Sequence, residues 1–234
     1  MAASDITPAL LAELGKVDTP TICNALEMVM QRELIRFTVV PFVSTEPDAV
    51  IVGFARTCTI RAEANSSLPG EAKKALRLKW YEHVANAKPG PNIALIQDLD
   101  SRPGTGAFWG EVNTTVHKGL GVLGCVTNGS IRDLGMVAKP FPLIAGMVNP
   151  SHAFVHVTGV GEQVSVHGMV VSDGELIHAD RHGAVVIPLD VATKVPGAID
   201  LGARKEKVIL DAANAKGFNF EVLRKALASS DEIH

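Results

Sequence analysis

The chain has 234 residues, of which 47% are hydrophobic and 20% charged, and its formal net charge is −3. This balance is that of an ordinary globular chain, slightly apolar for its length, and the length is ample for a large core. The lysines and arginines form no basic stripe, which argues against a nucleic-acid ligand, and no apolar run approaches the roughly 20 residues needed to cross a bilayer.

Helices and strands alternate in the first half of the chain. Asp18-Thr19-Pro20 predicts the start of a helix, because aspartate can cap it and proline fits its first turn. Apolar residues at helical spacing predict other helices, and β-branched runs predict strands. The further elements expected here are helices over residues 5–16 and 71–86 and strands over residues 37–42 (punctuated by Pro41), 50–60 and 92–97.

Asp98, Asp100 and the loop Pro103-Gly104-Thr105-Gly106 follow the last of these strands. The loop lacks the Gly-Lys-Ser/Thr of a phosphate-binding loop and the spacing of the dinucleotide fingerprint, so no nucleotide is expected. Ligands of open α/β sheets tend to bind at the carboxyl ends of strands, where both aspartates lie. Capping of the loop is the commoner role of such aspartates, and support of a bound ligand is the alternative.

The stretch from Gly110 to Asp133 carries the strongest functional pattern. A helix is predicted over residues 110–120, a buried strand over residues 122–126 and a sharp turn at Asn128-Gly129. Arg132 and Asp133 follow, where they would lie beside the free N–H groups of the helix start. Those donors favour an anion, arginine suits a carboxylate, and aspartate supplies hard oxygens for Mg²⁺ or Mn²⁺. A 2-oxo acid needs both kinds of group, although many Arg-Asp pairs are only solvated surface charges.

The remaining chain is rich in strands and ends in helices. Strands are expected over residues 141–147, 155–160 and 163–171, with a hairpin pair over residues 168–188 and a helical tail from residue 191.

The histidines of this part of the chain follow no zinc-binding spacing, so local hydrogen bonds are their expected role. They are His152, His156, His167, His178 and His182. Three cysteines without CxxC spacing indicate a reducing compartment, and Cys125 is expected in the core rather than as a nucleophile. No leader segment is recognised, and a cytoplasmic protein is expected.

Glu111, twenty intervening residues and Arg132-Asp133 resemble the motif of the class II pyruvate aldolases of the 4-hydroxy-4-methyl-2-oxoglutarate aldolase family. These enzymes share their fold with the regulator of ribonuclease activity A. Thr19-Pro20-Thr21 with Asn24-Ala25-Leu26 is also similar to the family, which usually has aspartate where this chain has Asn24. Two other departures are Asp173-Gly174-Glu175, where the family has Pro-Gly-Asp, and Glu111, where the best-known aldolases have aspartate.

The resemblance implies an α/β fold, a swivelling β/β/α sandwich with a mixed central sheet. It also implies one domain over residues 1–234, of which 189–234 form a helical C-terminal extension that reaches across a subunit or shields the sheet. Homotrimers or homohexamers are implied, with sites at subunit boundaries.

The activity implied is a metal-dependent lyase. It would cleave a 4-hydroxy-2-oxo acid of the 4-hydroxy-4-methyl-2-oxoglutarate type and would also decarboxylate oxaloacetate. Asp133 would bind Mg²⁺ or Mn²⁺, with Glu111 approaching the metal through water, and Arg132 would contact the substrate. The pocket would be lined by Gly110, Glu111, Val112 and Asn113. The alternative is a non-catalytic regulator that binds a protein such as a ribonuclease, whereas a methyltransferase is discounted because the usual glycine-rich cofactor loop is missing.

Overall fold

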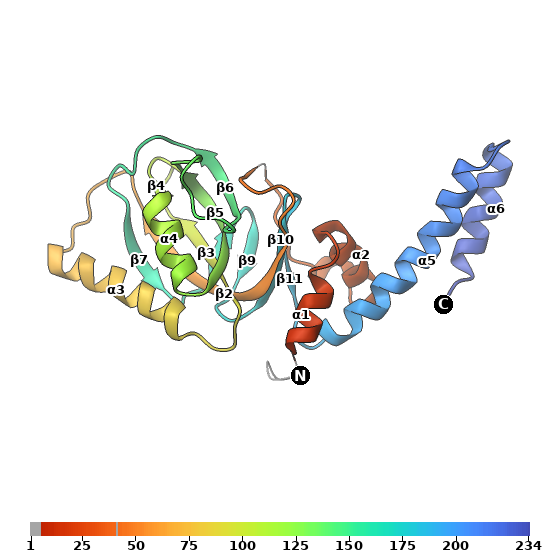
Figure 1. Cartoon of the computed structure of the whole chain (residues 1–234), viewed down its shortest axis with the longest axis horizontal. Helices are drawn as coiled ribbons and strands as arrows, with labels where there is room; N and C mark the ends of the chain where they lie inside the picture. Colours follow the sequence, from red (N-terminus) through yellow and green to blue (C-terminus); the bar gives the residue numbers. More distant parts are fainter. Residues whose placement is uncertain (1–5, 41) are drawn as a thin grey trace.

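The computed structural model describes residues 6–40 and 42–234, and Figure 1 shows a curled sheet with helices packed around it. Within these residues the main sheet has nine strands in the order β1-β6-β5-β3-β2-β10-β11, with β4 paired to β5 and β7 paired to β2. β8 and β9 form a separate hairpin. The strands are β1 (Val43–Ser44), β2 (Ile51–Arg61), β3 (Asn92–Asp98), β4 (Ala107–Trp109), β5 (Val122–Ile131), β6 (Leu143–Val148), β7 (His156–Val160), β8 (Val164–Val166), β9 (Met169–Val171), β10 (Leu176–Asp180) and β11 (Gly183–Ile187).

The parallel part of this mixed sheet positions the site. β2, β3, β5 and β6 pair in parallel, and β4 joins β5 in the same direction, whereas β7 and β10 pair with β2 antiparallel. The loops that leave β3, β4 and β5 therefore emerge toward one edge of the sheet, where ligands of such sheets tend to bind. The single-domain α/β sandwich with a mixed sheet, predicted from the sequence, is confirmed.

Helices cover the sheet through separate apolar clusters. Trp80 and Val84 pack with Trp109 and Phe141 on one side, whereas the first two helices and the start of the helix Val195–Asn214 pack against Phe54 and the β10-β11 hairpin. Asp18 caps the helix Thr19–Val29 as predicted, since its Oδ1 accepts from the Thr21 amide at 3.0 Å. The helices are α1 (Pro8–Leu14), α2 (Thr19–Val29), α3 (Gly70–Asn86), α4 (Glu111–Gly119), α5 (Val195–Asn214) and α6 (Phe220–Asp231).

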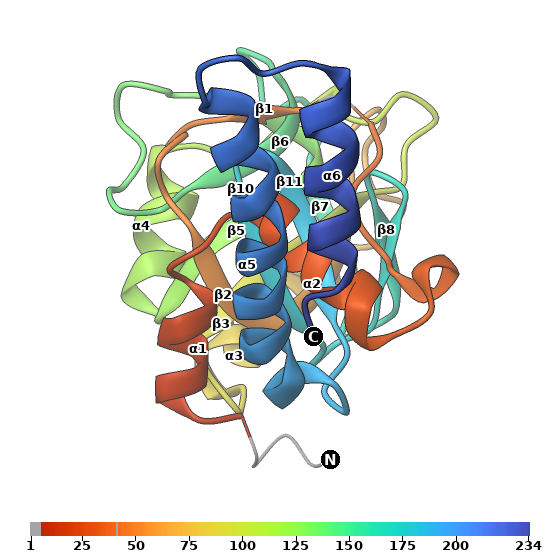
Figure 2. The same ribbon diagram turned by 90° about the vertical axis from the view of Figure 1, so that its right-hand side faces the viewer.

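The last two helices form an arm. Val195 and Ala198 of α5 are buried in the cluster that includes Leu26 of α2, and the rest of α5 leaves the body with α6 beside it (Figures 1 and 2). Beyond its first turns the arm does not lie on the sheet, and its contact with another subunit stays a prediction. Among the described residues, no helix combines the length and apolar character that a bilayer crossing requires.

The predicted strand over residues 37–42 is wrong. Phe37 makes only an isolated bridge to Val185, while the Thr38 amide donates to Ala184 and the Val39 amide donates to His167. The segment crosses β11 and then the turn of the β8-β9 hairpin, so its amides bond to two elements instead of one strand. Pro41 lies outside the described residues.

The predicted turn at Asn128-Gly129 is also wrong, because β5 continues to Ile131. The Asn128 side chain accepts from the Asp98 amide at 2.7 Å and donates to the Asp98 carbonyl at 3.0 Å. These bonds hold the end of β5 to the end of β3, at a point where the register with β6 shifts. The left-handed residue that follows β5 is Asp133, with φ 56°.

Candidate active site

The start of α4 and the end of β5 lie together. The Arg132 amide donates to the Trp109 carbonyl at 2.9 Å, and this places Arg132 and Asp133 beside Gly110, the residue before α4. The amide of Glu111, the first residue of the helix, donates to Oδ2 of Asp133 at 3.2 Å. The structure thus brings together the residues that the sequence pattern singled out, while their roles stay predictions.

Asp133 uses space that a glycine at position 110 leaves open. A Cβ on Gly110 would lie 2.5 Å from Oδ2 of Asp133 and 3.1 Å from Cγ of Arg132. Gly110 has φ −164°, an extended value open to any residue, so the close approach is what requires glycine. The Asp133 carbonyl accepts from the Met136 and Val137 amides, and aspartate tolerates its left-handed backbone better than most residues. Backbone and packing together fix the carboxylate over the helix start.

Positive charge gathers around this carboxylate. Nε of Arg132 lies 3.7 Å from Oδ2 of Asp133, and both side chains keep partial solvent exposure. Among the described residues, the Val112 and Asn113 amides have no hydrogen-bond partner, and they lie at the positive end of the α4 dipole. The site therefore offers an aspartate that can bind a cation, next to donors that can bind an anion.

A cavity of about 540 Å³ opens beside this cluster. Arg132, Gly110, Val112 and Asn113 line it, and α3 and residues 152–157 supply other parts of the wall. Asp133 and the exposed Glu111 are not among its lining residues, so the predicted lining by Glu111 is not seen. The volume is in the range of small-molecule sites.

The donor set fits a hydrated divalent cation. Within residues 6–40 and 42–234, no group of three or more His, Cys, Asp or Glu side chains could hold a metal ion. A fully protein-ligated zinc site is therefore not built from these residues. Mg²⁺ is usually bound by one or two carboxylates and keeps several waters, and the single partly exposed carboxylate of Asp133 is compatible with that mode.

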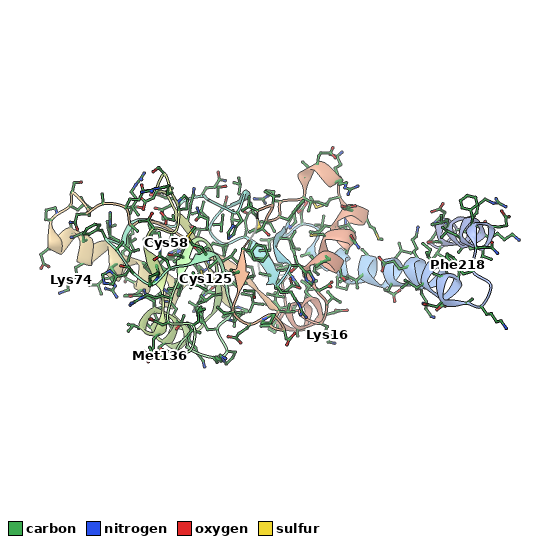
Figure 3. The ribbon with its side chains drawn as sticks, turned by 90° about the horizontal axis from the view of Figure 1, so that it is seen from above. Lys16, Cys58, Lys74, Cys125, Met136 and Phe218 are labelled. Atoms are coloured by element: carbon green, nitrogen blue, oxygen red, sulfur yellow. The ribbon has the colours of Figure 1, made fainter. Side chains whose placement is uncertain are left out.

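The other candidate side chains have local structural roles. His167 bonds to the Thr127 carbonyl at 2.8 Å, and His178 bonds to Thr19 and to the Val17 carbonyl. All three cysteines are free, and Figure 3 labels Cys58 and Cys125 inside the body. Cys125 is fully buried, which confirms its predicted place in the core, and this burial raises the pKa of its thiol well above the ordinary value.

Asp98 and Asp100 cap loops. Asp98 accepts from the Gly104 amide at 2.8 Å and from the Asp100 amide at 3.0 Å. Asp100 accepts in turn from the Ala62 and Glu63 amides. Burial raises the pKa of Asp98. Of the two predicted roles, the structure shows the commoner one, which is loop capping.

His117 was missed from the sequence, although it lies under the site. Its ring is buried among aromatic side chains, Nε2 accepts from Nε1 of Trp80 at 2.8 Å, and Nδ1 donates to the Asn113 carbonyl at 2.6 Å. These two bonds require the neutral tautomer with hydrogen on Nδ1. The helical spacing of four residues from Asn113 is the signal that could have indicated this contact.

His117 makes stability depend on pH. Burial lowers its pKa from 6.5 to about 4, so between these values the unfolded chain binds a proton that the folded chain does not. Stability is therefore expected to fall by about 3 kcal/mol as pH falls through this window, and His117 adds no further loss below it. Urea unfolding from pH 7 to pH 4 measures the slope. His117→Gln should flatten it, whereas His234→Gln, at the exposed last residue, should follow the wild type; equal slopes in all three proteins would contradict the assignment.

Comparisons with known proteins show the family of this chain and its fold. A family model described as RraA-like (Aldolase/RraA) matches residues 19–186. No curated protein matches the sequence. An uncharacterized protein from Pseudomonas syringae pv. tomato is similar in structure, with a TM-score of 0.72 and 20% identity over 96% of this chain and 95% of the other.

Two further solved structures are similar over most of their length. Streptomyces coelicolor RraAS2, titled an unusual member of the RNase ES inhibitor RraA protein family, has a TM-score of 0.68 and 21% identity over 86% of this chain and 96% of its own. A structure titled as novel cellulases from microbes associated with the gut ecosystem has a TM-score of 0.69 and 16% identity over 88% of this chain and 87% of its own. At these identities the likeness shows the fold alone.

Proposed function

The chain belongs to the RraA-like (Aldolase/RraA) family, and on that premise we propose that it is a divalent-metal-dependent lyase. Its substrate is a 4-hydroxy-2-oxo acid, which it cleaves to pyruvate and a carbonyl compound, and it also decarboxylates oxaloacetate. The proposed cofactor is Mg²⁺ or Mn²⁺. The observation that carries the proposal is the Asp133 carboxylate, held by the first amide of α4 beside Arg132 and next to a cavity of substrate size.

Each group of the site has a task in this chemistry. Asp133 would hold the divalent cation, which would supply Lewis-acid chemistry to the 2-oxo acid. Arg132 binds the substrate carboxylate through its planar fork. Water takes the proton of the C4 hydroxyl, the C4–O bond becomes a carbonyl, and the C3–C4 bond breaks with its electron pair forming the enolate of pyruvate. A proton from water then converts the enolate to pyruvate. Arg132 and the free amides of Val112 and Asn113 stabilise the developing negative charge more than they stabilise the ground state.

Oxaloacetate gives the same enolate by loss of CO₂ and needs no base for a hydroxyl proton. It is therefore the simpler first substrate.

A regulator that binds a protein partner is the second candidate, because solved structures with this fold include proteins described as RNA-processing and RNase inhibitors. Such a regulator has no need of a carboxylate positioned between an arginine and free helix donors.

Wild-type protein with Mg²⁺ or Mn²⁺ is expected to form pyruvate from oxaloacetate well above the rate with the metal alone. Pyruvate is followed by reduction with NADH and lactate dehydrogenase. Excess EDTA should return the rate to background, and added Mg²⁺ should restore it. A rate no higher than that of free metal would favour the regulator, and a rate indifferent to EDTA would remove the cation from the proposal.

A further inference from the structure

A second cationic group, on α3, lines the same cavity as the α4 start. Lys73, Lys74 and Arg77 of α3 line the same cavity as Arg132. Their spacing places them on one face of the helix, since residues three and four apart are neighbours. Figure 3 labels Lys74 on the outer part of α3, at the opposite end of the molecule from Phe218 in the arm.

These side chains have no acidic partner. Among the described residues, Lys73, Lys74 and Arg77 form no ion pair, and Arg132 pairs only with its neighbour Asp133. None of the cavity-lining residues is an aspartate or a glutamate. Four like charges around one concave surface raise the local concentration of anions and favour a ligand that carries more than one negative charge.

Arg77 is held in place by the start of α4. Its Nε donates to the Tyr81 hydroxyl at 3.0 Å, and the guanidinium lies 5.6 Å from the centre of the Tyr81 ring. The Tyr81 hydroxyl donates to Oδ1 of Asn113 at 3.0 Å, and Asn113 donates to the Phe108 carbonyl. Within the described part of the chain, these contacts leave the two terminal nitrogens of Arg77 free for a ligand. They also connect α3 to the start of α4, where the Glu111 amide donates to Asp133.

The wall of the cavity also contains apolar side chains. Phe108, Phe154, Val155 and Val157 contribute to it. A cavity with positive groups on two elements, α3 and the end of β5, and with apolar surface in its wall suits a short carbon chain with an anion at each end.

We propose that Lys73, Lys74 and Arg77 form a second anion-binding subsite, which holds the distal carboxylate or phosphate of a 2-oxo acid whose first carboxylate is bound by Arg132. This inference rests on the proposed function for the orientation of the substrate. The subsite makes a doubly charged acid a better substrate than a singly charged acid of the same length.

Two matched substrate pairs test the subsite and distinguish the two anions. One pair is 4-hydroxy-2-oxoglutarate and 4-hydroxy-2-oxopentanoate, and the other is a 2-keto-3-deoxy sugar acid with and without a 6-phosphate. If the subsite holds a carboxylate, the wild type should have a higher kcat/KM for 4-hydroxy-2-oxoglutarate than for 4-hydroxy-2-oxopentanoate. If it holds a phosphate, the wild type should have a higher kcat/KM for the phosphorylated sugar acid than for the unphosphorylated one. Lys73→Gln/Lys74→Gln/Arg77→Gln should lower that preference by about 10-fold to 100-fold, the usual effect of losing charge-assisted hydrogen bonds.

The double variant Lys73→Gln/Lys74→Gln preserves the Arg77–Tyr81 contact and should show the same direction of change if the triple variant does not fold. Lys79→Gln is the matched control, because Lys79 lies on α3 but is exposed outside the cavity lining. Its preference should equal that of the wild type. An unchanged preference in the double and triple variants would overturn the subsite.

Binding measured without turnover separates the subsite from the lyase activity. Glutarate and glycerol 3-phosphate are titrated calorimetrically into wild-type protein and the double variant. If no acid is cleaved, but one of these dianions binds the wild type at least tenfold more tightly than it binds the double variant, the lyase proposal fails and the subsite stands. If neither dianion binds more tightly to the wild type than to the variant, the subsite is overturned.

Discussion

Asp133→Asn is expected to lower kcat/KM for oxaloacetate about a thousandfold, which corresponds to about 4 kcal/mol of transition-state stabilisation. Asparagine has the shape of aspartate, its carbonyl oxygen can still accept from the Glu111 amide, and it tolerates the left-handed backbone at φ 56°. The substitution therefore removes the negative charge that would hold the cation and keeps the cap of α4. Pyruvate formation across a Mg²⁺ titration measures the loss.

The matched control is Asp211→Asn, in an exposed part of α5. It should keep wild-type activity, and thermal unfolding followed by circular dichroism should show that both variants fold. A normal kcat/KM in Asp133→Asn, with the metal dependence retained, would mean that the cation is bound elsewhere. If the wild type also shows no metal-dependent turnover, the result favours the regulator that binds a protein partner.

Local signals predicted the elements that carry the site. Asp18 and Pro20 marked the start of α2 because capping is a contact between neighbouring residues. The spacing of Glu111 and Arg132 predicted their meeting, because a helix followed by a strand parallel to β4 returns the chain to the same sheet edge. The family resemblance and the residue pattern therefore pointed to the same groups.

Contacts between residues far apart in the sequence could not be predicted from such local signals. Asn128-Gly129 has the composition of a turn, yet the Asn128 side chain bonds to the backbone of Asp98 and keeps β5 extended. The cations of α3 were likewise visible only as residues of a polar helix. Their function depends on where α3 lies against the start of α4, which is set by Tyr81 and by the buried Trp80–His117 bond.

Gly110→Ala is expected to lower kcat/KM for oxaloacetate by several hundredfold, nearly as much as the loss of the Asp133 charge. The φ of −164° suits alanine, so the backbone can stay as it is. The new methyl group, however, would lie 2.5 Å from Oδ2 of Asp133, and the carboxylate must move away from the Glu111 amide. A displacement of this order at a reacting group costs about 100-fold or more. Steady-state kinetics with saturating Mg²⁺ measure the effect.

Gly119→Ala provides the control on the same helix, because a Cβ there meets nothing within 4 Å. It should keep full activity and unfold at an equal or higher temperature, since alanine favours a helix over glycine. The overpacked Gly110→Ala protein should lose about 1–3 kcal/mol of stability. If it keeps full activity in spite of that loss, the place of Asp133 over the first amide of α4 is unimportant for turnover. The catalytic carboxylate would then have to be sought elsewhere, first at Glu111.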